Sequence, residues 1–395
     1  ISDVDGPASF QPQASTAGSY GTFSLAADGT WSFVANSAFN ELKVGDKLTE
    51  TFTVKAADGT SASVTVTING TNDKPVAFAD TQTTEENTVL HGQVPVATDV
   101  DGTIVRYEVV NNLAQGKGTL AFNEDGSYTF NPGTAFDHLA AGQSENVTFT
   151  YQAKDNNGAV SGPQTITIVV TGSNDAAVIS GVSSRDVNET DAPISTGGKL
   201  NITDVDGPAS FQAQSNVAGK YGTFNLGTDG NWTYVASSAY NELKQGQTLT
   251  DTFTVKAADG TSTTVTVNII GTNDKPVAFG DTVTTDENAV LNGHVPAATD
   301  IDGTIASYQL ATNVAAGKGT LTFNANGSYS FNPGTAFDHL AQGQSENVTF
   351  TYQAKDNNGA LSDPQTITIT VTGTNDKPVA YADTQTTEEN TVLHG

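Results

Sequence analysis

The feature that most constrains this chain is an internal repeat with a period of 201 residues. The segment DVDGPASF at residues 3–10 returns at residues 204–211, and FNPGTAFDHL at residues 130–139 returns at residues 331–340. A weaker period of about 100 residues lies within it, because a Gly-x-Asn-Asp motif begins at Gly70, Gly172, Gly271 and Gly373. Such a pattern predicts tandem copies of a small domain, here of two types in the order A-B-A-B.

The same motifs predict where the domains begin and end. We expect type A domains at residues 1–74 and 176–275, type B domains at 75–175 and 276–376, and the opening segment of a further domain at 377–395. The first type A copy has no counterpart of residues 178–201, and the chain contains no methionine, even at position 1. We therefore expect a monomeric internal segment of a longer protein, whose export signal lies elsewhere.

Alternating side chains predict that every domain is all-β. Val147, Phe149, Tyr151 and Ala153 fall on one face of an extended segment, with polar residues between them. The same two-residue period recurs in every copy, which is typical of strands with one buried face. About six or seven strands per hundred residues indicate immunoglobulin-like or cadherin-like Greek-key β-sandwiches. Tandem sandwiches of this kind predict an extended rod.

Turn residues mark the hairpins between these strands. Asp-Gly or Asn-Gly pairs suit two-residue turns in which both positions have positive φ. The expected hairpins lie at Asp28-Gly29, Asp125-Gly126, Asp229-Gly230 and Asn326-Gly327. The only helical signals are single turns, in which Phe39 precedes Leu42 and Phe136 precedes Leu139.

Charge and composition exclude several classes of function. The chain carries 16 basic and 43 acidic residues, a formal net charge of −27 at pH 7. Such a surface repels phosphate backbones and anionic lipids, so we expect neither nucleic-acid binding nor membrane insertion. The absence of cysteine excludes disulfides and thiol chemistry.

Acidic signatures recur at the predicted strand ends. Asn-Asp pairs lie in the linkers, at Asn72-Asp73, Asn174-Asp175, Asn273-Asp274 and Asn375-Asp376. Asp-x-Asp-Gly follows at Asp3/Asp5, Asp99/Asp101, Asp204/Asp206 and Asp300/Asp302. A late aspartate comes after the long alternating strand, at Asp58, Asp155, Asp259 and Asp356. A glutamate opens the domains at Glu86, Glu189, Glu287 and Glu389.

Two explanations compete for these signatures. Asp, Asn and Gly favour turns, and for the Asp-Gly hairpins that explanation suffices. Calcium requires six to eight oxygen ligands, which carboxylates, amides and carbonyls supply. Clustered carboxylates without a cation would repel one another, so the joint recurrence of the signatures favours calcium.

The motifs GTNDKPVA, Glu-Asn, ATDVDG and AKDNNG resemble those of bacterial cadherin-like repeats, over essentially the whole chain. The type A unit is similar to the VCBS repeat class. Both classes occur in giant RTX-type adhesins that are exported by type I secretion and hold bacteria in biofilms or on host surfaces. The resemblance implies a secreted, cell-surface location, with calcium ions and neighbouring domains of the chain as partners.

In cadherins, calcium binds where two domains meet, so the resemblance also implies a ligand set for each joint between domains. The first joint would use Asn72, Asp73, Asp99, Asp101 and Asp155. The second would use Glu86, Asn174, Asp175, Asp204, Asp206 and Asp259, and the third Glu189, Asn273, Asp274, Asp300, Asp302 and Asp356. The fourth would begin with Glu287, Asn375 and Asp376.

No catalytic constellation stands out beside these sites. The five histidines show no metal-ligand spacing and no Ser-His-Asp order, and carboxylate pairs that recur in each domain are unlike a single active site. We therefore expect a non-enzymatic spacer that projects a distal ligand-binding domain. The alternatives are domains that bind polysaccharide or each other, and accessory modules of a secreted hydrolase.

Overall fold

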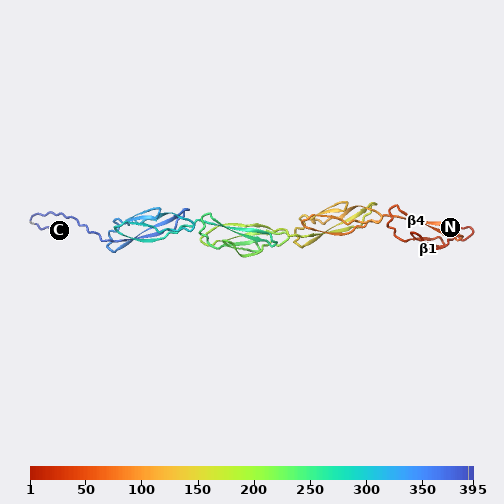
Figure 1. Ribbon diagram of the computed structural model, residues 1–395, viewed down its shortest axis with the longest axis horizontal. Coiled ribbons are helices and arrows are strands. Elements are labelled where there is room, and N and C mark those ends of the chain that lie inside the picture. The colour runs from red at the N-terminus through yellow and green to blue at the C-terminus, as the bar shows by residue number, and fades with distance from the viewer. Residues whose placement is uncertain (390) are drawn as a thin grey trace. The chain divides into compact units, whose positions relative to one another are not determined.

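The expected strands are present throughout the computed structural model, which describes residues 1–389 and 391–395. The described residues contain twenty-seven strands and no α-helix, and hence no helix that could span a membrane. Every sheet is built from strands of a single repeat, and Figure 1 shows the strands of each repeat gathered into a body of their own. The chain divides into two units, residues 1–178 with 203–209 and residues 179–202 with 210–395. The all-β prediction is confirmed.

The two type B repeats have the same topology. Each packs a four-stranded sheet, in the order β6-β12-β11-β8 or β21-β27-β26-β23, against a three-stranded sheet, β7-β10-β9 or β22-β25-β24. In the second repeat the strands are β6 (Asp80–Glu85), β7 (Leu90–Gln93), β8 (Ile104–Asn111), β9 (Thr119–Phe122), β10 (Ser127–Asn131), β11 (Ser144–Asp155) and β12 (Gln164–Thr171). In the fourth they are β21 (Asp281–Asp286), β22 (Leu291–His294), β23 (Ile305–Thr312), β24 (Thr320–Phe323), β25 (Ser328–Asn332), β26 (Ser345–Asp356) and β27 (Gln365–Thr372). The first strand pairs in parallel with the last, and all other pairs are antiparallel.

The third repeat, of type A, distributes its strands differently. A five-stranded sheet, β13-β15-β18-β17-β16, faces a three-stranded sheet, β14-β20-β19. The strands are β13 (Val178–Gly181), β14 (Ser184–Asn188), β15 (Ser195–Thr203), β16 (Gln214–Ala218), β17 (Gly222–Leu226), β18 (Asn231–Ala236), β19 (Thr248–Lys256) and β20 (Ser262–Ile270). In the first repeat only β1 (Gln13–Ala17), β2 (Gly21–Leu25), β3 (Trp31–Ala35), β4 (Lys47–Lys55) and β5 (Ser61–Asn69) are present.

The alternating pattern correctly identified the core. Val147, Phe149, Tyr151 and Ala153 are all at most 3% exposed, and they pack with the apolar face of β12. Phe136 and Leu139 are also buried, at the single turn in which the Leu139 N–H donates to the Phe136 carbonyl at 2.8 Å. The core thereby holds the end of each long strand in place, and this fixes where the following loop begins.

The two tryptophans occupy equivalent places in β3 and β18 but differ in burial. Trp232 is 1% exposed, and its indole N–H donates to the Val182 carbonyl at 2.8 Å. Trp31 is 50% exposed. In the third repeat β15 pairs with β18 and brings Gly198 against the Trp232 ring.

The expectation of two-residue hairpin turns is wrong in its detail. In the first hairpin the Gly29 N–H donates to the Ala26 carbonyl at 3.0 Å, and the Ala26 N–H donates to Thr30 at 2.8 Å. Among the described residues of this loop, only Gly29 has positive φ, at 90°. The pattern is a β-turn followed by a glycine in the left-handed region. Asp28 does not have positive φ, and its carboxylate accepts from the Thr30 N–H at 2.9 Å.

Candidate metal centre

The opening glutamates are among the most deeply buried of the predicted ligands. Glu86, Glu189 and Glu287 are at most 2% exposed. In each, Oε1 accepts hydrogen bonds from the N–H and hydroxyl of the linker residue that precedes the Asn-Asp pair; for Glu86 that residue is Ser173. Oε2 is buried and has no partner in any of the three. Each linker is therefore fastened to its preceding domain through one carboxylate oxygen, and the other oxygen remains available.

The Asp-x-Asp-Gly loops place their two carboxylates side by side. Asp204 Oδ1 accepts from the N–H groups of Asp206 and Gly207, at 3.2 and 2.8 Å, while its Oδ2 is buried without a partner. The Asp206 carboxylate also reaches the linker, because its Oδ2 accepts from the Asp175 N–H at 3.2 Å. The first joint repeats this arrangement, with the Asp73 N–H donating to Asp101 at 3.3 Å. Predicted ligands from linker and loop thus come together.

The late aspartates of the type B repeats hold the linker asparagine. The Asn72 Nδ2 donates to Asp155 Oδ2 at 2.7 Å, and Asn157 Nδ2 donates back to Asn72 Oδ1 at 2.6 Å. At the third joint, Asn273 is held in the same way by Asp356 and Asn358. Burial alone would raise the pKa of Asp356, but hydrogen bonds from Asn273 and from backbone N–H groups of its loop outweigh burial and lower it. Asp356 therefore stays charged.

The late aspartates of the type A repeats occupy a different place from those of type B. In type B, the Asp155 N–H donates to Ala159 at 3.0 Å, which marks Asp155 as the first residue of the loop. In the third repeat, that place belongs to Ala257, whose N–H donates to Thr261 at 2.8 Å. Asp259 comes two residues later and accepts from the Thr261 N–H at 2.9 Å. The late aspartates of the two domain types thus differ in position by two residues, and the role of Asp259 as a ligand stays a prediction.

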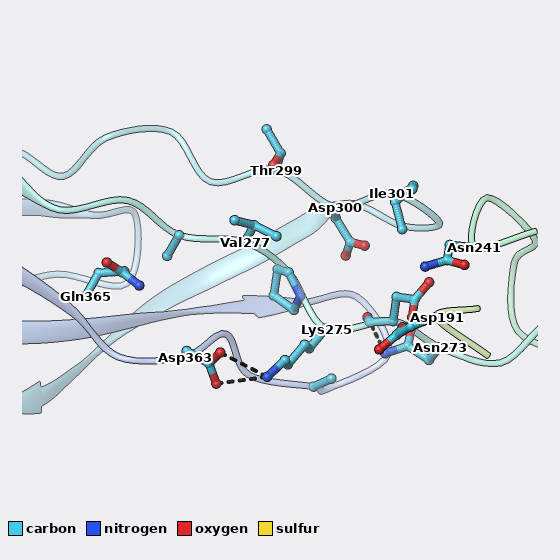
Figure 2. Close-up of a pocket in the computed structure, with 14 residues that line it drawn as sticks. Asp191, Asn241, Asn273, Lys275, Val277, Thr299, Asp300, Ile301, Asp363 and Gln365 are labelled. Carbon is cyan, nitrogen blue, oxygen red and sulfur yellow. Dashed lines mark hydrogen bonds and ion pairs between the residues drawn. The ribbon is translucent and has the colours of Figure 1, made fainter. Parts of the chain in front are cut away.

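The carboxylates of the third joint are disfavoured in their charged form by burial and by one another. Burial raises the pKa of Asp274 to about 6, and the nearby carboxylates of Glu189, Asp191, Asp302 and Asp300 contribute in that order. Both oxygens of Asp300 and of Asp302 are buried without a hydrogen-bond partner. Figure 2 shows Asp300 directed into an open cavity of about 860 Å³, with Asp191 and Asn273 at one end and the Lys275–Asp363 ion pair, at 2.9 Å, along one wall.

Three residues that the sequence reasoning missed lie beside the predicted ligands. Asp137 helps to raise the pKa of Asp175, after burial and Glu86. Asp191 and Asn241 line the cavity of the third joint, and the Asn241 Oδ1 is buried without a partner. A signal existed for two of them, because a polar residue stands between Phe or Tyr and Leu in the same single turn of each repeat, at Asn40, Asp137, Asn241 and Asp338.

The donor set fits a hard cation. Every predicted ligand at these joints offers oxygen, with no sulfur or imidazole, and the unpartnered oxygens are buried at each of the first three joints. In the described part of the chain, no three or more acidic or histidine side chains converge closely enough to coordinate one ion as they stand. At the fourth joint, the Asn288 amide donates to Asp376 at 3.5 Å, and Asn375 lies in the same linker.

Comparison with known proteins agrees with this architecture. The family described as the bacterial cadherin-like domain matches residues 1–70, 72–172, 174–271 and 273–373. The calcium-binding lectin RapA2 of Rhizobium johnstonii is 29% identical over 207 residues, which cover 46% of this chain and 86% of the lectin. Neither the bacterial cadherin-like repeat nor the lectin RapA2 is named as an enzyme.

The fold is shared with a solved cadherin structure. The extracellular domain of protocadherin gamma B4 has a TM-score of 0.50 at 15% identity, over 92% of this chain and 60% of that chain. Cadherin domains 1–5 of protocadherin gamma B2 give 0.48 at 15% identity, over 93% and 73%. The chain thus spans 60% of the length of the first, and at this identity the likeness concerns the fold alone. Since the four family matches cover nearly all of residues 1–373, the protein belongs to the bacterial cadherin-like domain family.

Proposed function

We propose that this chain is a calcium-stiffened spacer of a bacterial surface adhesin, in which ions at the joints hold successive domains in line. The observation that carries the proposal is the set of buried carboxylate oxygens without a partner at the joints. They belong to Glu86, Asp99, Asp101, Asp204, Asp206, Glu189, Asp274, Asp300, Asp302 and Glu287. A buried carboxylate is normally hydrogen-bonded or paired, so a recurring set of unpartnered ones indicates a missing counter-charge.

Calcium is the cation that these joints fit best. It accepts oxygen ligands in flexible numbers and geometries, whereas magnesium demands a near-ideal octahedron and retains its waters. At the third joint the ligands would be Glu189, Asp274, Asp300, Asp302 and Asp356, with Asn273 at the edge of the set. Bound calcium would supply the positive charge that lets these carboxylates approach one another.

The spacer role follows from where the ligands come from. At the third joint they belong to the domain before the linker (Glu189), to the linker (Asn273 and Asp274) and to the domain after it (Asp300, Asp302 and Asp356). An ion shared among the three restricts the linker, so a run of such joints would project a distal ligand-binding domain from the cell. We place the protein outside the cell, in an adhesin of the RTX type that is exported by type I secretion and supports biofilm formation.

Calorimetry with and without calcium tests the proposal. Binding to the folded state alone stabilises by RT ln(1 + [L]/Kd), which is about 2.7 kcal/mol when calcium is at 100 times its Kd. We expect the melting temperature of the chain to rise in millimolar calcium and to fall with chelator, with magnesium a poor substitute. Superimposable melting curves in calcium and in chelator would contradict the proposal.

Glycan binding is the second candidate, favoured by the cavity at the third joint. Val277 and Ile301 line it with 54% and 60% of their surface exposed, next to the carboxylates of Asp191 and Asp300 (Figure 2). Apolar side chains beside an ion site can contact a sugar ring while its hydroxyls approach the cation. The relative RapA2 is named a calcium-binding lectin.

A glycan array probed in calcium and in chelator separates the two candidates. Calcium-dependent capture that is lost in Val277→Asp and Ile301→Asp, with unchanged calcium stabilisation, would favour the lectin role. Val76→Asp, at the corresponding place of the first joint, is the matched control. If no glycan is captured while calcium still stabilises the chain, the result supports the spacer role.

A further inference from the structure

Two consecutive asparagines follow the late aspartate in each type B repeat, at Asn156-Asn157 and at Asn357-Asn358. None of the four is among the predicted calcium ligands, and all four are exposed. Each of them nevertheless makes hydrogen bonds to a segment that carries predicted ligands. Those bonds give the asparagines a role that the acidic signatures do not reveal.

The first asparagine of each pair holds the Asp-x-Asp-Gly loop. Asn357 Oδ1 accepts from the N–H and the hydroxyl of Thr304, the residue directly after the motif, at 2.7 and 3.2 Å. Asn156 makes the same two bonds to Thr103 at the same distances. A Cβ on Gly303 would lie only 2.6 Å from Asn357 Oδ1, so the glycine of the motif allows this close approach.

The second asparagine of each pair holds the linker. Asn358 Nδ2 donates to Asn273 Oδ1, and Asn273 Nδ2 in turn donates to Asp356 Oδ2 at 2.7 Å. At the first joint, Asn157 Nδ2 donates to Asn72 Oδ1 at 2.6 Å. The two bonds fix which end of the linker amide faces which partner, and the next linker residue is a predicted ligand.

The loop that presents these asparagines is itself held by hydrogen bonds. Asp356 Oδ1 accepts from the N–H groups of Asn358, Gly359 and Ala360, at 2.9, 2.5 and 2.8 Å. Asn357 Nδ2 also donates to Asn358 Oδ1 at 2.9 Å. The loop therefore connects the Asp-x-Asp-Gly segment and the linker through protein contacts alone.

We propose that Asn357 and Asn358 are positioning residues of the third joint, and Asn156 and Asn157 of the first, which assemble the ligand-bearing segments before an ion arrives. This rests on the proposed calcium-binding function. Without these bonds, calcium would have to order the linker and the Asp-x-Asp-Gly loop as it binds, and the cost of that ordering would lower the affinity.

Hydrogen exchange of the full chain, followed across a calcium titration, tests the positioning role. Asn357→Ala and Asn358→Ala should each raise the calcium concentration for half-protection of residues 271–277 about fivefold, the factor that one neutral hydrogen bond contributes. A merely structural role would lower stability in calcium and in chelator alike and leave this midpoint in place. Residues 70–76, at the unaltered first joint, serve as the internal reference.

Asn347→Ala is the matched control. It removes the bond from the Thr370 hydroxyl at 2.9 Å, in the same strand but nine residues before Asp356, which is about 30 Å away. The midpoint of residues 271–277 should not move in this variant. Unchanged protection of β26 and β27 verifies that each variant is folded.

Two aspartate variants separate positioning from charge. Asn357→Asp keeps an oxygen that can accept from Thr304, so the midpoint should stay at or below that of the wild type. Asn358→Asp adds the same charge but at pH 7 has no hydrogen to donate to Asn273, so the midpoint should rise. Equal shifts in both, or alanine variants that leave the midpoint in place, would refute the positioning role but not calcium binding. No calcium-dependent protection at any joint up to ~10 mM, a hundredfold above a Kd of ~10⁻⁴ M, would overturn the proposed function itself.

Discussion

Replacing Asp302 by asparagine should change the stability of the chain in opposite directions with and without calcium. Asp302 is 4% exposed, and neither carboxylate oxygen has a hydrogen-bond partner. Burial raises its pKa, and the adjacent Asp300 carboxylate adds to the rise. Asparagine keeps the size of the side chain and removes one negative charge from the third joint.

The magnitudes follow from the electrostatics of the joint. The pKa of Asp274 is raised from 3.8 to about 6, mainly by burial, and each unit corresponds to about 1.4 kcal/mol. Neighbouring charges supply the smaller share, so removing one of them should stabilise the calcium-free fold by about 1 kcal/mol. With calcium at about 100 times its Kd, the ion contributes about 2.7 kcal/mol, and an approximately 30-fold loss of affinity removes about 2 kcal/mol of it.

Scanning calorimetry at pH 7 measures both effects. A domain of this size shifts by about 4–8 °C per kcal/mol, so the affected transition should rise by about 5 °C in chelator. In calcium the gain of about 1 kcal/mol offsets part of the loss of about 2 kcal/mol, so the transition should fall by about 5 °C. Asp229→Asn is the control, because Asp229 caps an exposed hairpin whose counterpart in the fourth repeat is Asn326. Shifts of the same sign in both buffers would refute the assignment: stabilisation in both would mean that Asp302 binds no ion, and destabilisation in both that it has a structural partner.

Three further outcomes are expected. The folded-state pKa of Asp274 is raised to about 6, so the calcium-free fold should gain stability as pH falls from 7 to 5. The calcium-bound fold should lose stability over the same range, because protonation competes with calcium. A gap between the two melting temperatures that does not narrow between pH 7 and pH 5 contradicts that reasoning. Asp204→Asn with Asp206→Asn should abolish calcium ordering at the second joint, which single-particle electron microscopy would detect as a bend there, while Asp229→Asn leaves the particles unaltered. Straight particles with unchanged calcium binding would show that Asp204 and Asp206 are not the ligands. Asp251 is buried and accepts from Lys220, Tyr221 and Tyr234, at 2.8, 2.9 and 2.9 Å, so Asp251→Ala should cost about 3 kcal/mol in urea unfolding of the third repeat, equally with and without calcium; a cost that depends on calcium would assign this carboxylate to the metal instead.

Local chemistry in the sequence was sufficient to predict the strands and to single out candidate ligands. A two-residue period has one structural meaning when every second side chain is apolar, so Val147, Phe149 and Tyr151 had to share a buried face. The Asp-x-Asp-Gly loops and Asn-Asp linkers were expected to meet because the resemblance to cadherin repeats implies that they do. The structure brings them together, as the bond from the Asp175 N–H to Asp206 records.

Other properties depended on contacts that no local pattern encodes. Trp232 is buried because residues far from it in the sequence lie against it: Gly198 is next to its ring, and the Val182 carbonyl accepts from its indole N–H. Asp137, Asp191 and Asn241 lie near the linker carboxylates because of the path of the chain. The recurring polar residue of the single turn marks Asp137 and Asn241 in the sequence, but it does not place them beside the linker. Ala257 and Asp356 occupy the same place because backbone hydrogen bonds set the register of the loop, whereas the sequence had aligned Asp259 with Asp356. The sequence by itself determined which residues could be strands and which could be ligands, since those are properties of single side chains and of their period. Which carboxylates are buried, and which asparagine is held, was decided only by the tertiary structure, because burial and hydrogen bonding depend on partners far away along the chain.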